Sequence, residues 1–271
     1  RAEFVPFKNL FPLEGDDLPE GKDGWLLFLD EFNSASRSVQ AASYKLILDR
    51  MTGLHNLHEN VYVVAAGNLD SDRAITNSLS TAMQSRLIHI EMDVSYKEWL
   101  EDVALKQNYD SRVIGFLSMY PNKLMNFDPR HQDKTFCCPR TWEFVQKLVK
   151  DLPEITDSHA ALLAGTITSG VAAEFIQFSK IFNEMISLTD ILNDPENCRL
   201  PADASNKWAT TSHLLEKTDL KNFEKISVYM DRFSIDFRIL FYRAILIKLP
   251  EIRSHKSYVQ SMVSLAKYIY S

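Results

Sequence analysis

The chain has 271 residues, a formal net charge of −6 and a hydrophobic content of 45%. This is the composition of a soluble globular protein with enough apolar material for more than one domain. No apolar run approaches the roughly 18 residues that span a bilayer, and the mild acidity argues against a surface built for the nucleic-acid backbone. The three cysteines, of which Cys137 and Cys138 are adjacent, form no disulfide framework and fit a reducing, cytoplasmic environment.

The amino-terminal third alternates apolar strands with helical patterns, after an opening loop rich in glycine, proline and acids. This alternation predicts a parallel sheet with right-handed crossovers. The continuous apolar run of the first strand predicts burial on both faces. The expected elements are, in chain order, strand Trp25–Leu29, helix Arg37–Arg50, a hairpin or loop at Gly53–Asn60, strand Val61–Ala66, a helix near Ser78–Met83 and strand Leu87–Met92.

From about Ser95 strand signals end and apolar residues recur at helical spacing. Pro139 is well placed at a helix start. His55 and His58 form the closest histidine pair, but no cysteine or acidic cluster accompanies them, so a turn is expected there and not a metal site. The expected helices are Tyr96–Gln107, Ser111–Met119, Pro139–Lys150, Ala160–Phe182, Leu188–Leu192, Ser205–Lys217, Leu220–Leu249 with a break near Arg232, and Ser254–Tyr270.

Polar side chains follow the predicted strands in a defined order. Asp30 and Glu31 come directly after the first strand and Asn68 after the second, which predicts a position at the sheet edge where open α/β sheets bind ligands. Arg86 precedes the third strand, and Arg140 stands at a helix start. Phosphoryl transfer requires positioning and charge neutralisation, which carboxylates, an amide and two guanidinium groups supply. Taken singly, each also fits a structural role as a solvated acid, a turn residue, a surface cation or a helix-start residue.

The order of these motifs over about residues 20–150 resembles that of AAA+ ATPases of the MoxR-like type. The matching segments are Leu26-Leu27-Phe28-Leu29-Asp30-Glu31-Phe32-Asn33 with Ala35, Val39-Gln40 and Leu46 (the Walker B strand and helix), Val63-Val64-Ala65-Ala66-Gly67-Asn68 (sensor 1), Ser85-Arg86-Leu87 (the arginine-finger position) and Cys137-Cys138-Pro139-Arg140 (sensor 2).

The resemblance implies an α/β fold joined to an all-α part. Residues 1–94 would be the carboxyl-terminal part of a partial parallel-sheet AAA+ core whose amino-terminal half is missing. Residues 95–155 would form a helical lid that carries sensor 2, and residues 156–271 a helical extension.

The resemblance also implies hydrolysis of ATP with Mg²⁺. Asp30 would hold the metal, Glu31 would orient the attacking water and Asn68 would contact the γ-phosphate. Arg86 would complete the ATP site of a neighbouring subunit in a ring, a hexamer in this family, whereas Arg140 would act in its own subunit and report lid closure.

Two departures from the family pattern affect these assignments. The arginine-finger context in the family is Asp-Arg-Phe, whereas here it is Ser85-Arg86-Leu87, so Arg73 is an alternative finger.

The partners that the resemblance implies are a protein substrate or a protein with a von Willebrand A domain. The segment Gly53–Asn60 would point at a pore or partner.

The second departure is the phosphate loop. A Walker A motif needs Gly-x-x-x-x-Gly-Lys-Ser/Thr between a strand and a helix. The nearest candidate, Gly15 to Lys22, has five residues between its glycines, Asp23 in place of the hydroxyl residue, and a strand after it. We therefore expect the phosphate loop upstream and this part alone to be inactive. The alternatives are a non-catalytic AAA+-derived scaffold and, against the acidic charge balance, an ATPase that remodels nucleic acid.

Overall fold

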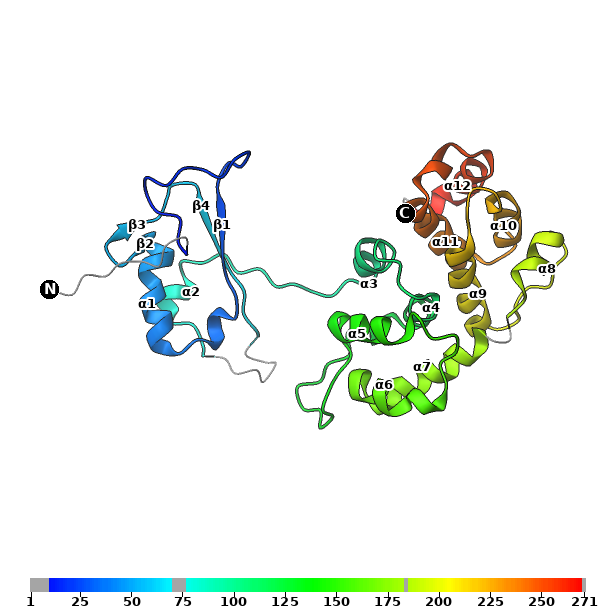
Figure 1. Ribbon diagram of the computed structural model, residues 1–271, viewed down its shortest axis with the longest axis horizontal. Coiled ribbons are helices and arrows are strands. Elements are labelled where there is room, and N and C mark those ends of the chain that lie inside the picture. Colours follow the sequence, from blue (N-terminus) through cyan, green and yellow to red (C-terminus); the bar gives the residue numbers. More distant parts are fainter. Residues whose placement is uncertain (1–9, 70–76, 183–184, 270–271) are drawn as a thin grey trace. The chain divides into compact units, whose positions relative to one another are not determined.

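The computed structural model describes residues 10–69, 77–182 and 185–269 (Figure 1). The chain divides into two compact units. Unit 1 comprises residues 1–92 and 128–130, and unit 2 comprises residues 93–127 and 131–271. Unit 1 carries a small sheet with helices, whereas the described elements of unit 2 are all helices. The protein is therefore an α/β protein joined to a helical part.

The sheet of unit 1 is a parallel pair. Strand β1 (Trp25–Leu29) pairs with β4 (Val61–Ala65), and the register runs from Trp25 opposite Val61 to Leu29 opposite Ala65. Between them lie α1 (Arg37–Leu48) and a hairpin of β2 (Met51–Thr52) and β3 (His55–Asn56). This strand–helix–strand order confirms the first two predicted strands, the crossover helix and the segment predicted as a hairpin or loop.

The described residues bury only one face of this sheet. Leu46 of α1 packs with Leu57 and Val61, and the inward residues of the two strands lie against them. The prediction that β1 is buried on both faces is wrong. Successive side chains of a strand point to opposite faces, and a helical layer covers only one of them here. The exposed face carries Leu26, Phe28, Tyr62 and Val64, whose exposed fractions are 66%, 52%, 72% and 46%.

The predicted third strand is also absent from the described part of unit 1. Residues 87–92 form no β-ladder with any described residue. Ile88, Ile90 and Met92 are 93%, 83% and 91% exposed. Alternating apolar residues favour a strand, but a strand also needs a neighbour that accepts its backbone hydrogen bonds. The preceding helix is shorter than predicted, with α2 at Thr81–Gln84.

Unit 2 packs its helices around an aromatic core. The Phe116 ring of α4 lies 5.6 Å from the Trp142 ring of α5 and 5.4 Å from the Phe175 ring of α7, centroid to centroid. All three side chains are fully buried. The helices are α3 (Tyr96–Glu98), a π-helix (Trp99–Ala104), α4 (Ser111–Met119), α5 (Pro139–Val149), α6 (Ala160–Ile167), α7 (Ser169–Ile181), α8 (Leu188–Asn193), α9 (Ala204–Lys217), α10 (Phe223–Met230), α11 (Ile235–Lys248) and α12 (Lys256–Ile269). Short 3₁₀ turns lie at Pro121–Lys123, Asp157–His159 and Pro250–Ser254.

Helix α4 approaches α9 closely at Gly115. A Cβ atom at this position would lie 2.6 Å from Ser212 Oγ of α9, so any larger residue would force the Ser212 side chain or the helix to shift. The predicted boundaries of α4, α5 and α9 are correct to within one residue.

Two of the predicted helices need correction, and the predicted break in a third helix is confirmed. The expected helix Ala160–Phe182 is interrupted at Thr168, whose φ of 76° lies outside the helical region. The expected helix Tyr96–Gln107 continues after α3 as a π-helix that ends at Ala104. The break predicted near Arg232 separates α10 from α11. In the part of the chain that the structure describes, no helix combines the length and hydropathy needed to cross a bilayer.

Candidate functional site

The carboxyl ends of β1 and β4 lie side by side because the two strands are parallel and in register. The connection continues beyond the strands. The Ala66 N–H donates to the Leu29 carbonyl at 2.9 Å, and the Phe32 N–H donates to the Ala66 carbonyl at 2.8 Å. The segment that carries Asp30 and Glu31 is therefore tied to the segment that leads to Asn68. This is the edge where α/β sheets bind ligands.

The two carboxylates occupy a tight turn. Glu31 has a φ of 50°, in the left-handed region that non-glycine residues adopt uncommonly. Its backbone N–H donates to Asp30 Oδ1 at 2.9 Å. Buried Phe32 and the 3₁₀ turn Phe32–Ser34 follow directly. The Asp30 and Glu31 side chains are exposed and form no ion pair with any described residue.

Oxygen donors of this kind suit a hard divalent cation such as Mg²⁺. Within the described residues, no group of three or more histidine, cysteine or acidic side chains gathers as a metal cage. Magnesium is commonly held by one or two carboxylates together with substrate phosphates and waters. Asp30 and Glu31 therefore fit an ion that arrives with a phosphate-bearing ligand.

Asn33 contacts Asn68 directly, and sequence reasoning assigned it no role. Asn33 Oδ1 accepts from the Asn68 N–H at 3.0 Å, and Asn33 Nδ2 donates to the Asn68 carbonyl at 2.6 Å. The only sequence signal was an amide residue two positions after the paired acids. Both described hydrogen bonds of Asn68 use its backbone, and its side chain is exposed.

The three arginines named from the sequence have different surroundings. Arg86 follows α2 in unit 1, is exposed, and donates from Nη1 to the Ala82 carbonyl at 2.7 Å. Arg140 lies in the first turn of α5 in unit 2 and is exposed, with no hydrogen bond or ion pair to any described residue. Asp30, Glu31, Asn68 and Arg86 thus belong to one unit and Arg140 to the other. Arg73 lies outside the described residues.

The stretch from Gly15 to Lys22 is a loop, as the sequence predicted. Gly15 and Gly21 adopt φ values of 94° and 68°, and the Lys22 N–H closes a turn on the Pro19 carbonyl at 3.0 Å. No helix begins there, since β1 starts at Trp25. This loop lacks the strand-to-helix geometry in which backbone N–H groups cradle phosphates.

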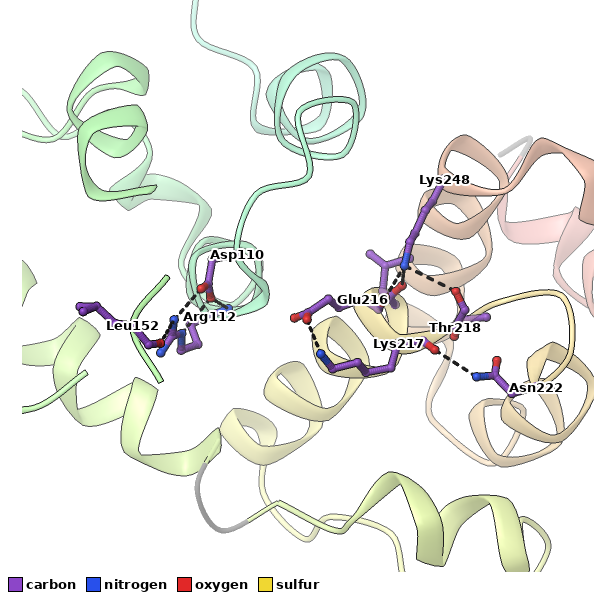
Figure 2. Close-up of polar contacts among 9 residues, drawn as sticks. Asp110, Arg112, Leu152, Glu216, Lys217, Thr218, Asn222 and Lys248 are labelled. Atoms are coloured by element: carbon purple, nitrogen blue, oxygen red, sulfur yellow. Dashed lines mark hydrogen bonds and ion pairs between the residues drawn. The ribbon is translucent and has the colours of Figure 1, made fainter. Parts of the chain in front are cut away.

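A second polar cluster lies in unit 2, where a buried arginine and a half-buried lysine meet carbonyls at helix ends (Figure 2). Arg112 forms a bidentate pair with Asp110, with Nη2–Oδ2 at 2.6 Å and Nε–Oδ1 at 2.8 Å. Both side chains are about nine-tenths buried. Arg112 Nη2 also donates to the carbonyls of Val149 and Leu152, at 2.8 and 3.0 Å, where α5 ends. The guanidinium thus satisfies carbonyls that the helix leaves open.

Lys248 performs the same task for α9. Its ammonium reaches from α11 to the carbonyls of Leu215, Glu216 and Thr218 (Figure 2). Burial lowers the pKa of Lys248. Burial raises the pKa of Glu216, but hydrogen bonds from Lys217 and Ser111 outweigh it and the net shift is downward.

A cavity of about 290 Å³ lies beside these groups. Its lining includes two carboxylates, those of Asp110 and Glu216, and two ammonium groups, those of Lys150 and Lys248. Asp110, Glu216 and Lys248 already have hydrogen-bonding partners in the fold. We therefore assign this cluster to the stability of unit 2. Sequence reasoning missed it, because the carbonyls that Arg112 and Lys248 contact are 30 to 40 positions away in the chain.

Comparison with protein-family models, with curated proteins and with solved structures found no match.

Proposed function

We propose that this chain is part of a magnesium-dependent ATPase similar to the MoxR-like AAA+ type. The observation that carries the proposal is the parallel pairing of β1 with β4, which brings Asp30 and Glu31 to the same sheet edge as Asn68. Carboxylates for a metal and a water, beside an amide for a phosphate, are the parts that phosphoryl transfer uses.

In the proposed reaction a water attacks the γ-phosphorus of ATP. The bond from that phosphorus to the β,γ-bridging oxygen breaks, and ADP leaves with the bonding electron pair. Glu31 orients the water and accepts its proton, and Asn68 contacts a γ-phosphate oxygen. Asp30 would hold Mg²⁺, which would neutralise negative charge on the phosphates.

The phosphate loop is not among these 271 residues. The proposal therefore requires that loop from another polypeptide segment. Arg86 would act on the ATP of a neighbouring subunit in a ring, a hexamer in this family, and Arg140 would contact the phosphates of its own subunit. Both side chains are exposed, which supports such roles. The free energy of ATP hydrolysis would be used to remodel a protein substrate or a partner with a von Willebrand A domain.

A second candidate is a non-catalytic scaffold that binds protein partners. The exposed apolar face of Leu26, Phe28, Tyr62 and Val64 favours it, because contiguous exposed apolar residues mark interaction surfaces.

The test compares ATP hydrolysis by the parent protein, meaning the natural polypeptide that contains these residues, with that of Glu31→Gln. We expect magnesium-dependent hydrolysis in the wild type and a loss in kcat of at least about 100-fold in the variant, with ATP still bound. Glu20→Gln, an exposed glutamate in the loop before β1, is the matched control and should keep full activity. Absence of hydrolysis by the wild-type parent would favour the scaffold. Full activity in Glu31→Gln would remove the proposed catalytic role.

A further inference from the structure

The backbone of Asn68 is held at two points by one side chain. Asn33 Oδ1 accepts from the Asn68 N–H at 3.0 Å, and Asn33 Nδ2 donates to the Asn68 carbonyl at 2.6 Å. A primary amide has a donor and an acceptor on the same carbon, so it can pair with both peptide groups that flank one Cα atom. This fixes the peptide planes on both sides of Asn68, and with them the direction in which its side chain leaves the backbone.

Asn33 is itself held by the surrounding chain. Its carbonyl accepts from the Asn77 N–H at 2.7 Å, and Asn77 Nδ2 donates to the Ala35 carbonyl at 3.0 Å. Buried Gln40 of α1 donates to the carbonyls of Ala35 and Asn77, at 3.1 and 3.2 Å. Hydrogen bonds therefore connect the turn after β1 to α1 and to the chain beyond β4. These bonds hold the backbone of Asn33 in place.

Gly67 leaves the space that this bridge needs. A Cβ atom at Gly67 would lie 2.3 Å from Asn33 Oδ1 and 2.8 Å from Asn33 Cγ, which is closer than real contacts allow. The backbone of Gly67 is not in the left-handed region, so an alanine there meets no conformational penalty of its own. The requirement for glycine at this position comes from the Asn33 side chain.

We propose that Asn33 is a positioning residue that sets the place of the Asn68 side chain relative to Asp30 and Glu31. The proposal rests on the ATPase function proposed above. The side-chain amide of Asn33 uses both its donor and its acceptor on the Asn68 backbone. The described contacts leave the side-chain amide of Asn68 available for a phosphate oxygen. Misplacement of a substrate-contacting group by about 1 Å costs on the order of 100-fold in rate.

The test is a cycle of Asn33→Ala, Gly67→Ala and the double variant in the parent protein. Asn33→Ala should lower kcat by about 10- to 100-fold and change KM for ATP by less than about 3-fold. Gly67→Ala should lower kcat similarly, because its methyl displaces Asn33. The double variant should be no slower than Asn33→Ala, since the clash requires both side chains. Asn197→Ala removes an exposed amide in unit 2 that bonds to Asp194, and should leave kcat unchanged.

A second readout separates this proposal from the ATPase itself. In the 271-residue chain without nucleotide, the Asn68 amide should exchange with deuterium at least about 10-fold faster in Asn33→Ala than in the wild type, because its hydrogen-bond acceptor is lost. If the wild-type parent hydrolyses no ATP but this exchange effect appears, the function fails and the bridge stands. Unchanged exchange, unchanged kcat in Asn33→Ala, or additive losses in the double variant would overturn the positioning role.

Discussion

The two units hold their structures in different ways. Unit 2 packs a large aromatic core, in which Phe116, Trp142 and Phe175 are fully buried. Unit 1 has a small cluster around Leu46, Leu57 and Val61, and one face of its sheet is exposed. The local geometry at the ends of β1 and β4 depends on hydrogen bonds more than on apolar packing. Asp30, Glu31, Asn68 and Arg86 therefore belong to the less densely packed unit, whereas Arg140 belongs to unit 2.

The charged groups of the two units differ in the same sense. In unit 2, Arg112 and Lys248 are committed to helix-end carbonyls. In unit 1, Asp30 and Glu31 are exposed and form no ion pair with the described residues. Buried, fully partnered charges hold a fold, whereas exposed carboxylates at a sheet edge are available to a ligand. Burial and partnership thus separate structural charges from candidate functional ones.

The largest expected effect contrasts two phenylalanines. Phe116→Ala should destabilise unit 2 by about 3–5 kcal/mol because it empties a fully buried site. Phe28→Ala should cost unit 1 less than about 1 kcal/mol, since Phe28 is 52% exposed. Hydrogen–deuterium exchange read by mass spectrometry measures each unit separately. Equal losses in the two units would contradict the packing difference.

The next effect contrasts two aspartate–arginine pairs. Arg112→Met leaves Asp110 buried without its partner and uncaps α5, so we expect a loss of about 3 kcal/mol in the free energy of unfolding of unit 2. Arg130 pairs with Asp128 at 3.3 Å, with side chains that are 79% and 53% exposed. Arg130→Met should change stability by less than about 0.5 kcal/mol. Denaturant unfolding of both variants tests this, and a comparable loss from the exposed pair would refute it.

The smallest effect depends on pH. Burial lowers the pKa of His213. The negative charge of Glu216 raises this pKa, and the positive charge of Lys217 lowers it further, so the net shift is downward. The unfolded chain, in which histidine titrates near about 6.5, then binds the proton more readily than the folded chain does. The stability of unit 2 should therefore fall as pH drops through about 6.5 toward the lower folded pKa, by at most about 1.4 kcal/mol per pH unit.

The control for this pH effect is a second histidine of unit 2. His213→Gln should flatten the dependence of the free energy of unfolding between pH 7.5 and 5.5. His131→Gln changes an exposed histidine and should leave the slope as it is in the wild type. An unchanged slope in His213→Gln would show that another group controls the effect.

Much of the secondary structure could be predicted from the sequence, because apolar spacing and capping residues act locally. The crossover from β1 through α1 to β4 and the bounds of α4 follow from such signals. The prediction of a third strand was wrong because the alternation of apolar and polar residues at positions 87–92 does not supply a neighbouring strand to pair with. The break at Thr168 stands directly before Ser169-Gly170, a dipeptide that is typical of turns and that the prediction of one continuous helix did not take into account.

The candidate site was predictable only in outline. Chain order suggested that Asp30, Glu31 and Asn68 belong together, and their roles in catalysis remain predictions. The Asn33–Asn68 bridge spans 35 positions and depends on the register of two strands, which the sequence does not specify. The carbonyl contacts of Lys248 likewise depend on how α11 packs beside α9.

The most direct test of the central claim asks where the metal binds. Mn²⁺ replaces Mg²⁺ in the parent protein, and electron paramagnetic resonance measures the Mn²⁺ bound in the presence of ATP. We expect nucleotide-dependent binding in the wild type, its loss by at least about 10-fold in Asp30→Ala, and its retention in Asp49→Ala, which removes an exposed carboxylate at the end of α1. Equal Mn²⁺ binding by Asp30→Ala and the wild type would contradict a metal–nucleotide site at the end of β1.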